Sequence, residues 1–195
     1  MLPDVEKLSL QLPPDITPAL KKTLIERATI LEFKKGDTII DESFSNTKAY
    51  HILKGSCVRY IITSRGDEKA IMFHTEDFMP VLGNAYINSD HSIVSYLVKA
   101  NEKTTIAALD LSLFFKWGIT DAAYARFAGK NAIRYISIQN QFQNHLTGLA
   151  SAEFLAWLMK RHPFIFHRFA SKDIANFMGI TPVWLSTLKS RLAKK

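Results

Sequence analysis

Twenty residues near the C-terminus, 171–190, constrain the fold more than any other part of the sequence. A small residue, Ala175, stands at the fifth position, where two helices must approach closely, and Gly179 stands at the ninth, where a turn needs a positive φ. The positions that would lock the second helix onto the first are all apolar: Ile174, Met178, Ile180, Leu185 and Leu188. Thr181 followed by Pro182 is a typical helix start, because the hydroxyl caps free N–H groups and proline has none to lose. The spacing predicts a helix-turn-helix whose second helix begins at about Pro182; the alternative is a pair of unrelated short helices.

Positive charge is concentrated in the same part of the chain. Residues 1–115 carry a formal net charge of −2, residues 116–150 of +3 and residues 151–195 of +6. A solvated surface would mix both signs, whereas closely spaced phosphates require this excess of Lys and Arg. The charge distribution therefore favours double-stranded DNA as the partner of the predicted helix-turn-helix.

Length and composition limit the remaining choices. The 195 residues are 47% hydrophobic and 22% charged, enough for one core of roughly 100 residues and a small helical unit. The single cysteine, Cys57, excludes an internal disulfide, a cysteine-ligated cluster and a cysteine-rich zinc site within one chain. The first ten residues lack the features of a signal peptide, and no run of about 18 apolar residues is present. We therefore expect a cytoplasmic protein.

Three regions follow one another along the chain. Residues 15–31 predict a short amphipathic helix, and from Leu31 to about Leu111 short β-branched and aromatic runs alternate with turns. Residues 121–149 predict one long helix, and a further helix is expected between Ser151 and Pro163. The expected fold class is α+β: a β jelly-roll domain, a long dimerisation helix and a small helix-turn-helix domain. The predicted boundaries of these three parts are 1–115, 116–149 and 150–195.

The long helix offers a seam for a second copy of the chain. Its heptad core positions give a predicted dimer interface at Ala128, Asn131, Tyr135, Ile138 and Phe142. The alternative is that this stripe packs on the β domain of its own chain, because a helix of a globular domain has a similar pattern. A two-fold dimer would double the contact with a palindromic DNA site, so we expect a homodimer.

The order of these parts resembles a known family. The residues that carry the likeness are FKKGDTII at 33–40, YHILKG at 50–55, VRY at 58–60, KDIA at 172–175 and GITP at 179–182. Over nearly its whole length the chain resembles the Crp/Fnr transcription regulators, and its last motifs are similar to a subgroup common in Bacteroidetes-type bacteria. The resemblance implies a cyclic-nucleotide-binding-like sensor domain and a homodimer that binds DNA to activate or repress transcription. RNA polymerase is a further candidate partner.

The sensor region departs from the members of that family that bind cyclic AMP or cyclic GMP. Those members present a Gly-Glu pair and an Arg followed by Ser or Thr in the stretch that here runs over about 78–98. In this chain Gly83 is followed by Asn84, and no arginine lies between Arg65 and Arg126. A buried cyclic phosphate would therefore lack its bidentate partner, and we predict that the domain does not bind cyclic nucleotides.

Any small-molecule effector should accordingly be uncharged or apolar, and its identity is unknown. The candidate residues for its pocket lie in the same stretch: Leu82, Gly83, Asn84, Ser92 and Ser95. The iron–sulfur branch of the family needs several cysteines, so it is excluded, and a haem held by a histidine is left open.

No other chemistry is indicated by the sequence. The six histidines do not pair with carboxylates at metal-binding spacings, and His51 and His74 fall in predicted strands, where a structural role is expected. No nucleophile elbow or phosphate-cradling glycine loop is present. We therefore expect no metal, no cofactor and no enzymatic activity.

Within the second helix, Leu185 and Leu188 must face inward, which leaves the other side for DNA. The predicted DNA-contacting residues are Ser171, Lys172, Thr181, Pro182, Val183, Ser186, Thr187 and Lys189. By resemblance, Pro182, Val183 and Thr187 would approach base edges. They can contact a thymine methyl or give one hydrogen bond, but they cannot make the bidentate guanine contact of arginine. We expect Trp184 to pack between helices.

The interpretation that follows is a homodimeric DNA-binding transcription regulator. The rival interpretation is a sensor or interaction module whose helical tail binds a protein partner and not DNA.

Overall fold

The structure is a computed structural model that describes residues 15–41, 47–83 and 95–193. In these ranges eight strands form two four-stranded antiparallel sheets, accompanied by seven helices. The first sheet has the order β1 (Thr29–Phe33), β8 (Thr104–Asp110), β3 (Lys48–Lys54) and β6 (Val81–Leu82). The second has the order β2 (Thr38–Asp41), β7 (Tyr96–Ala100), β4 (Ser56–Ile62) and β5 (Glu68–Thr75). The pairings join strands far apart in the sequence, as in a jelly roll.

The core of the β roll lies between the two sheets. Side chains from both sheets meet there, including Ile52, Ile106, Tyr96 and Val98, all at most 1% exposed. Strand β8 is buried on both faces, because Ile106 points into this core while Ala107 and Leu109 join a second cluster formed with helices. The β3–β4 turn requires a glycine: Gly55 has φ +108°, and a Cβ there would lie 2.7 Å from the Thr104 Cα.

Three helices close one end of the roll. They are α2 (Pro18–Arg27), α3 (Leu111–Thr120) and α4 (Ala122–Gly148), and they pack on β8 through Leu20, Leu24, Trp117 and Tyr124. Asp121 stands between α3 and α4 and joins all three helices. Its carboxylate accepts the Tyr124 backbone N–H at 2.9 Å, which caps α4, and the Thr17 hydroxyl at 2.9 Å, at the start of α2. This residue therefore marks the point where α3 ends and α4 begins.

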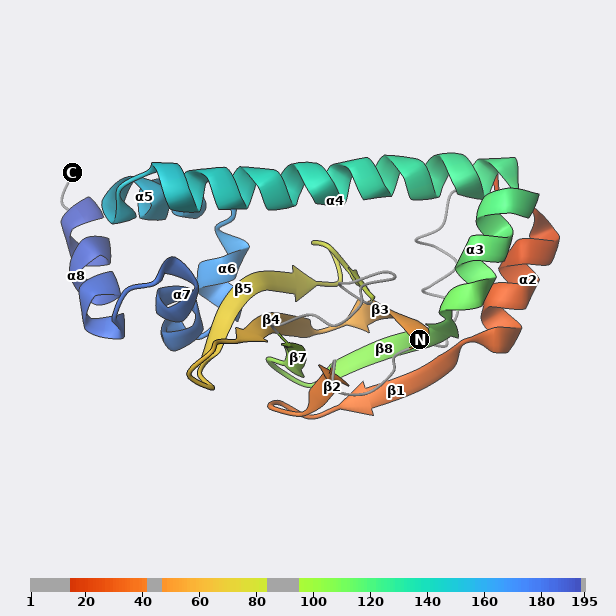
Figure 1. The fold of residues 1–195 in the computed structure, drawn as a ribbon, viewed down its shortest axis with the longest axis horizontal. Helices are drawn as coiled ribbons and strands as arrows, with labels where there is room; N and C mark the ends of the chain where they lie inside the picture. The colour runs from red at the N-terminus through yellow and green to blue at the C-terminus, as the bar shows by residue number, and fades with distance from the viewer. Residues whose placement is uncertain (1–14, 42–46, 84–94, 194–195) are drawn as a thin grey trace.

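The long helix α4 runs along the whole molecule and joins the roll to a C-terminal helical unit (Figure 1). That unit consists of α5 (Ser151–Arg161), α6 (Phe164–Arg168), α7 (Ser171–Met178) and α8 (Pro182–Leu192). It lies against the roll, with α7 beside β5 (Figure 1). Phe73 of β5 packs on Phe169 and Phe177 with ring centroids 4.7 and 5.2 Å apart, inside one apolar cluster shared by β4, β5, α4 and α5–α8. Burial of this shared cluster fixes the helical unit on the roll.

The predicted α+β fold class is confirmed, and the long helix expected over 121–149 is α4. Two expected helices differ at their ends. The helix predicted over 15–31 stops at Arg27, because residues 29–33 pair with β8 as strand β1. The helix expected between Ser151 and Pro163 ends at Arg161, and its N-cap is Ala150, whose backbone N–H donates to Glu153. Among the described residues, no helix combines the length and apolar character needed to cross a membrane.

Candidate nucleic-acid interface

Helices α7 and α8 have the geometry of a helix-turn-helix. Ala175 is fully buried where the helices meet, and Gly179 takes the left-handed conformation with φ +70°. The Gly179 and Ile180 N–H groups donate to the Asn176 and Ala175 carbonyls, which ends α7. The apolar positions of the motif face inward: Ile174, Met178, Leu185 and Leu188 are at most 8% exposed, and Ile180 packs against the same cluster. The predicted motif is thus confirmed as a structure.

Helix α8 begins as its sequence predicts. The Thr181 hydroxyl accepts the Trp184 backbone N–H at 3.1 Å, and Pro182 occupies the first turn. The helix N-terminus therefore has a fixed direction, and its first two turns present Pro182, Val183 and Ser186 to solvent. Val183 is 77% exposed, so its isopropyl group is free for contact with a partner.

The predicted DNA-contacting residues do not all lie on one open surface. Ser171, Lys172, Thr181, Pro182, Val183 and Ser186 are exposed, and Thr187 and Lys189 are half-buried. The Thr187 hydroxyl donates to the Val183 carbonyl at 3.1 Å, so its proton is already used. The Lys189 ammonium lies 4.9 Å from the Phe166 ring centroid and is held against α6.

Two side chains on α8 were not given a DNA-facing role by sequence reasoning. Trp184 is 40% exposed and does not pack between helices as expected; instead the Arg191 guanidinium lies 5.2 Å from its ring centroid. The two residues are seven apart, which places them on the same side of a helix two turns apart. That spacing was the signal that could have found the pair.

The helical unit is attached to the β4–β5 hairpin by polar contacts at the end of α7. The Lys69 ammonium donates to the Asn176 and Phe177 carbonyls, the latter at 3.1 Å, and so compensates the negative end of the α7 dipole. The Asn176 side chain donates to the Glu68 carbonyl at 3.0 Å and accepts the Ala70 N–H at 2.6 Å. Burial lowers the pKa of Lys69. These contacts set the angle of α7 on the roll.

A second polar attachment lies at the end of α6. The Arg168 guanidinium donates to Glu76 at 2.7 Å and to Glu102, and the Asn101 amide donates to the Arg168 carbonyl at 2.8 Å. Ser56 also donates to Glu102, at 2.7 Å. Burial would raise the pKa of Glu102, but the hydrogen bonds from Ser56 and Arg168 outweigh it, so this pKa lies below its usual range.

A third attachment joins β4 to α7 directly. The Tyr60 hydroxyl donates to the Asp173 carboxylate at 3.1 Å. Burial, followed by the Asp173 charge, raises the pKa of Tyr60 well above its ordinary value, so the hydroxyl stays a donor at any physiological pH. The helical unit is therefore held by contacts from β4, β5 and the turn before β8.

Three of the five effector-pocket candidates lie in the described part of the chain. Leu82 is fully buried in the core of the roll, Gly83 is half-buried and Ser95 is exposed. Asn84 and Ser92 lie outside the described residues. The Gly83 carbonyl accepts a 3.3 Å hydrogen bond from the Tyr96 hydroxyl.

Sequence reasoning missed a guanidinium beside Gly83. It belongs to Arg59 of β4, whose Nη2 lies 3.5 Å from the Gly83 carbonyl oxygen and whose Cζ lies 5.2 Å from the Tyr96 ring centroid. The family pattern places an arginine within about 78–98, where this chain has none. Arg59 stands on β4, where it pairs with Val98 of β7, and cross-strand neighbours are separated in sequence by the connections between strands.

The predicted dimer seam on α4 faces the chain itself. Phe142 is 2% exposed in the shared apolar cluster, and Tyr135 and Ile138 pack against that cluster. The Tyr135 hydroxyl accepts the Val81 N–H at 2.8 Å, and Ala128 packs against the Trp117 cluster. Packing on the roll and the helical unit therefore covers most of this stripe within a single chain.

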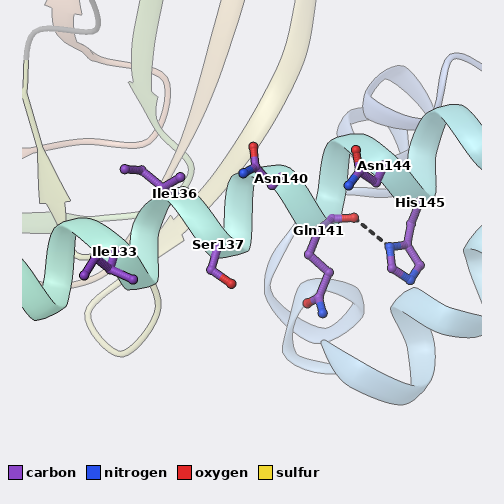
Figure 2. A pocket seen from close by; sticks show the side chains of 7 residues that line it. All are labelled: Ile133, Ile136, Ser137, Asn140, Gln141, Asn144 and His145. Carbon is purple, nitrogen blue, oxygen red and sulfur yellow. Dashed lines mark hydrogen bonds between the residues drawn. The ribbon is translucent and has the colours of Figure 1, made fainter.

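The opposite side of α4 carries exposed apolar residues. Ile133 is 71% exposed and Ile136 is 56% exposed. Figure 2 shows both beside a shallow hollow along the helix, lined further by Ser137, Asn140, Gln141, Asn144 and His145. The His145 ring stacks on Trp157 with centroids 4.3 Å apart, which marks the end of the hollow next to α5. Ile133 and Ile136 are thus apolar side chains of α4 that the described part of the chain leaves uncovered.

The histidines in the strands are structural groups. His74 is buried, and its Nδ1 donates to the Met79 carbonyl at 2.8 Å. Burial, with the Arg59 charge, lowers the pKa of His74 to about 3, and burial lowers that of His51 to about 4. In the part of the chain that the structure describes, no three His, Cys, Asp or Glu side chains gather as a metal site would require.

Comparison with solved structures shows the class of fold. FixK2 from Bradyrhizobium japonicum aligns over 86% of this chain and 85% of its own, with a TM-score of 0.70 and 18% identity. A cyclic-nucleotide-binding-domain protein from Listeria monocytogenes aligns over 96% and 91%, with a TM-score of 0.69 and 15% identity. A regulator assigned to the crp/fnr family from Eubacterium rectale aligns over 89% and 82%, with a TM-score of 0.65 and 13% identity.

The chain therefore has the fold of Crp/Fnr transcription regulators, in which a cyclic-nucleotide-binding-like β roll is followed by a long helix and a helix-turn-helix. No protein-family model and no curated protein matches the sequence.

Proposed function

We propose that this protein is a DNA-binding transcription regulator of the Crp/Fnr type. The observation that carries the proposal is the α7–α8 motif, which combines helix-turn-helix geometry with an exposed first half of α8. Basic side chains in the same unit, such as Lys172 and Arg161, are exposed and suit a phosphate backbone. RNA polymerase is the further partner that this function implies, the cytoplasm is its compartment, and no enzymatic activity accompanies it.

The three parts of this regulator would be a sensor over 1–115, a dimerisation helix within 116–149 and a DNA-binding unit over 150–195. The sensor would not bind cyclic nucleotides, because residues 78–98 contain no arginine to pair with a cyclic phosphate and Gly83 is followed by Asn84. Calorimetric titration with cyclic AMP, cyclic GMP and cyclic di-GMP tests this. Saturable heat with any of them would contradict it.

The regulator would act as a homodimer that pairs through the outward side of α4, and not through the stripe around Phe142. Ile133 and Ile136 would meet their copies, and Asn140, one heptad after Ile133, would fix the register. Replacing both isoleucines by Asp should give a monomer in sedimentation at concentrations where the parent protein is a dimer. Ile119→Asp on α3 is the matched control, since Ile119 is 86% exposed and lies away from this side. A dimer that survives the double substitution would place the interface elsewhere.

The decisive experiment is selection of bound sequences from a random duplex pool, followed by a salt titration on the enriched site. We expect a palindrome with half-sites about one helical turn apart. Lys172→Glu should weaken binding to every sequence and lower the salt slope by roughly one for each phosphate that is no longer neutralised. Lys116→Glu makes the same charge change on exposed α3 and should leave binding intact. Unchanged binding of Lys172→Glu, or no enrichment, would favour the rival protein-interaction module.

A further inference from the structure

The first turn of α8 presents an almost apolar surface. Pro182 and Val183 are exposed and have no side-chain hydrogen-bonding group, and Val183 is the most exposed aliphatic residue of the helix. In a helix-turn-helix the N-terminal residues of the second helix are those that reach base edges. The residues placed to read sequence are therefore not the donors and acceptors that usually do so.

Two threonine hydroxyl groups beside Val183 are already engaged, whereas the exposed Ser186 hydroxyl has room to contact DNA. The Thr181 hydroxyl accepts the Trp184 N–H at 3.1 Å as the helix cap, and the Thr187 hydroxyl donates to the Val183 carbonyl at 3.1 Å. Thr187 thus keeps its methyl group and an acceptor lone pair, but it has no proton to give to a base. Its position four residues after Val183 puts it on the same side of the helix.

The basic groups of α8 are also held by neighbours. The Lys189 ammonium lies over the Phe166 ring of α6, and the Arg191 guanidinium lies over the Trp184 ring. A guanidinium stacked on an aromatic ring suits a phosphate contact at the edge of the groove better than a bidentate contact with guanine at its floor.

Thymine is the base that fits such a surface. In the major groove its C5-methyl group is the apolar feature that distinguishes it, whereas the other bases present polar edges that an isopropyl group would desolvate without replacing their hydrogen bonds. We infer that Val183, assisted by the Thr187 methyl, is the specificity-determining residue of this regulator and selects thymine in each half-site through its 5-methyl group. This inference rests on the proposed DNA-binding function.

The test uses the full-length protein and the duplex enriched in the selection above, with each thymine replaced in turn by deoxyuridine, which lacks only the methyl. We expect one position per half-site where the replacement weakens binding about fourfold, and about fifteenfold when both half-sites are changed. Val183→Ala changes both protomers, so it should weaken binding to the thymine duplex, and the difference in affinity between the thymine and uracil duplexes should shrink. A change in DNA shape caused by uracil would persist in Val183→Ala, so the pair of substitutions separates contact from shape.

Three results would overturn the inference. Equal affinity of the parent protein for all uracil-substituted duplexes would remove the methyl contact and leave the DNA-binding function standing. Enrichment of guanine opposite the start of α8 would assign the reading to Arg191 and also leave that function standing. Absence of binding to any duplex would refute the proposed function together with the inference.

Discussion

The two sides of helix α4 carry similar apolar residues in different surroundings. On the inner side Phe142 is 2% exposed and belongs to the cluster that joins the β roll to the helical unit. On the outer side Ile133 is 71% exposed and lies beside an open hollow (Figure 2). The same division holds in α8, where Leu185 is 1% exposed and Val183 is 77% exposed. Substitutions on the buried sides of these helices should therefore lower stability, whereas substitutions on the exposed sides should leave stability almost unchanged.

The largest effect is expected at the inner side of α4. Phe142→Ala should lower the free energy of unfolding by about 3–5 kcal/mol, because it leaves a cavity between the roll and the helical unit. Ile133→Ala should change it by less than about 0.5 kcal/mol in the monomer, since that side chain is mostly in water. Urea unfolding at dilute protein measures both. Equal losses would mean that the two sides of α4 contribute equally to the free energy of unfolding.

A smaller effect is expected where ion pairs hold the helical unit. Arg168→Met should cost about 1–2 kcal/mol, because the guanidinium is only 26% exposed and both Glu76 and Glu102 lose a charged donor. Arg126→Met is the matched comparison: its pair with Asp15 is 3.5 Å long and mostly exposed, and its removal should cost less than about 0.5 kcal/mol. Chemical unfolding measures the two variants. A larger loss of unfolding free energy for Arg126→Met than for Arg168→Met would mean that the exposed ion pair stabilises the protein more than the partly buried one.

The pH dependence of stability should reveal the buried histidines of the roll. The pKa of His74 is lowered to about 3, so below pH 6.5 the unfolded chain binds a proton that the folded chain does not. Stability should therefore fall as the pH is lowered from about 6.5, and a shift in His51 of the same sign adds to the fall. His74→Gln should reduce the proton uptake on unfolding by about one between pH 6 and pH 4. An unchanged slope would mean that His74 titrates normally in the folded protein.

The smallest effect on stability is expected at the N-terminus of α8. Val183→Ala should change the free energy of unfolding by less than about 0.5 kcal/mol, whereas Leu185→Ala should cost about 2–5 kcal/mol. Thermal unfolding of both variants measures this difference. A clearly destabilised Val183→Ala would show that Val183 packs within the fold and is not a free contact surface.

Local spacing was enough to predict the helix-turn-helix. Ala175, Gly179 and the Thr181–Pro182 pair act within a few residues, through helix contact, a left-handed turn and a cap, so their positions in the sequence already contain the geometry. The alternation of short strands and turns likewise predicted a β roll, and residues 121–149 predicted the long helix. The resemblance to Crp/Fnr regulators predicted the order of these parts.

The side of α4 that faces the chain could not be predicted in this way. A hydrophobic period identifies the apolar stripe through Phe142, but it does not tell whether that stripe packs on its own chain or on a second copy. The choice between them depends on where the β roll and the helical unit stand. The predicted dimer residues Tyr135, Ile138 and Phe142 were consequently assigned to the side that the chain itself covers.

The sequence by itself determined the elements whose causes are local: the helix-turn-helix, the start of α8, the alternating strands and the length of α4. Only the tertiary structure decided which groups meet across the chain. It brought Arg59 to Gly83, Lys69 and Asn176 to the junction of α7 with β5, and Arg168 to two glutamates. The physical reason is that these contacts join residues 24 to 108 positions apart, and their formation depends on the burial of the shared apolar core and not on the propensities of neighbouring residues.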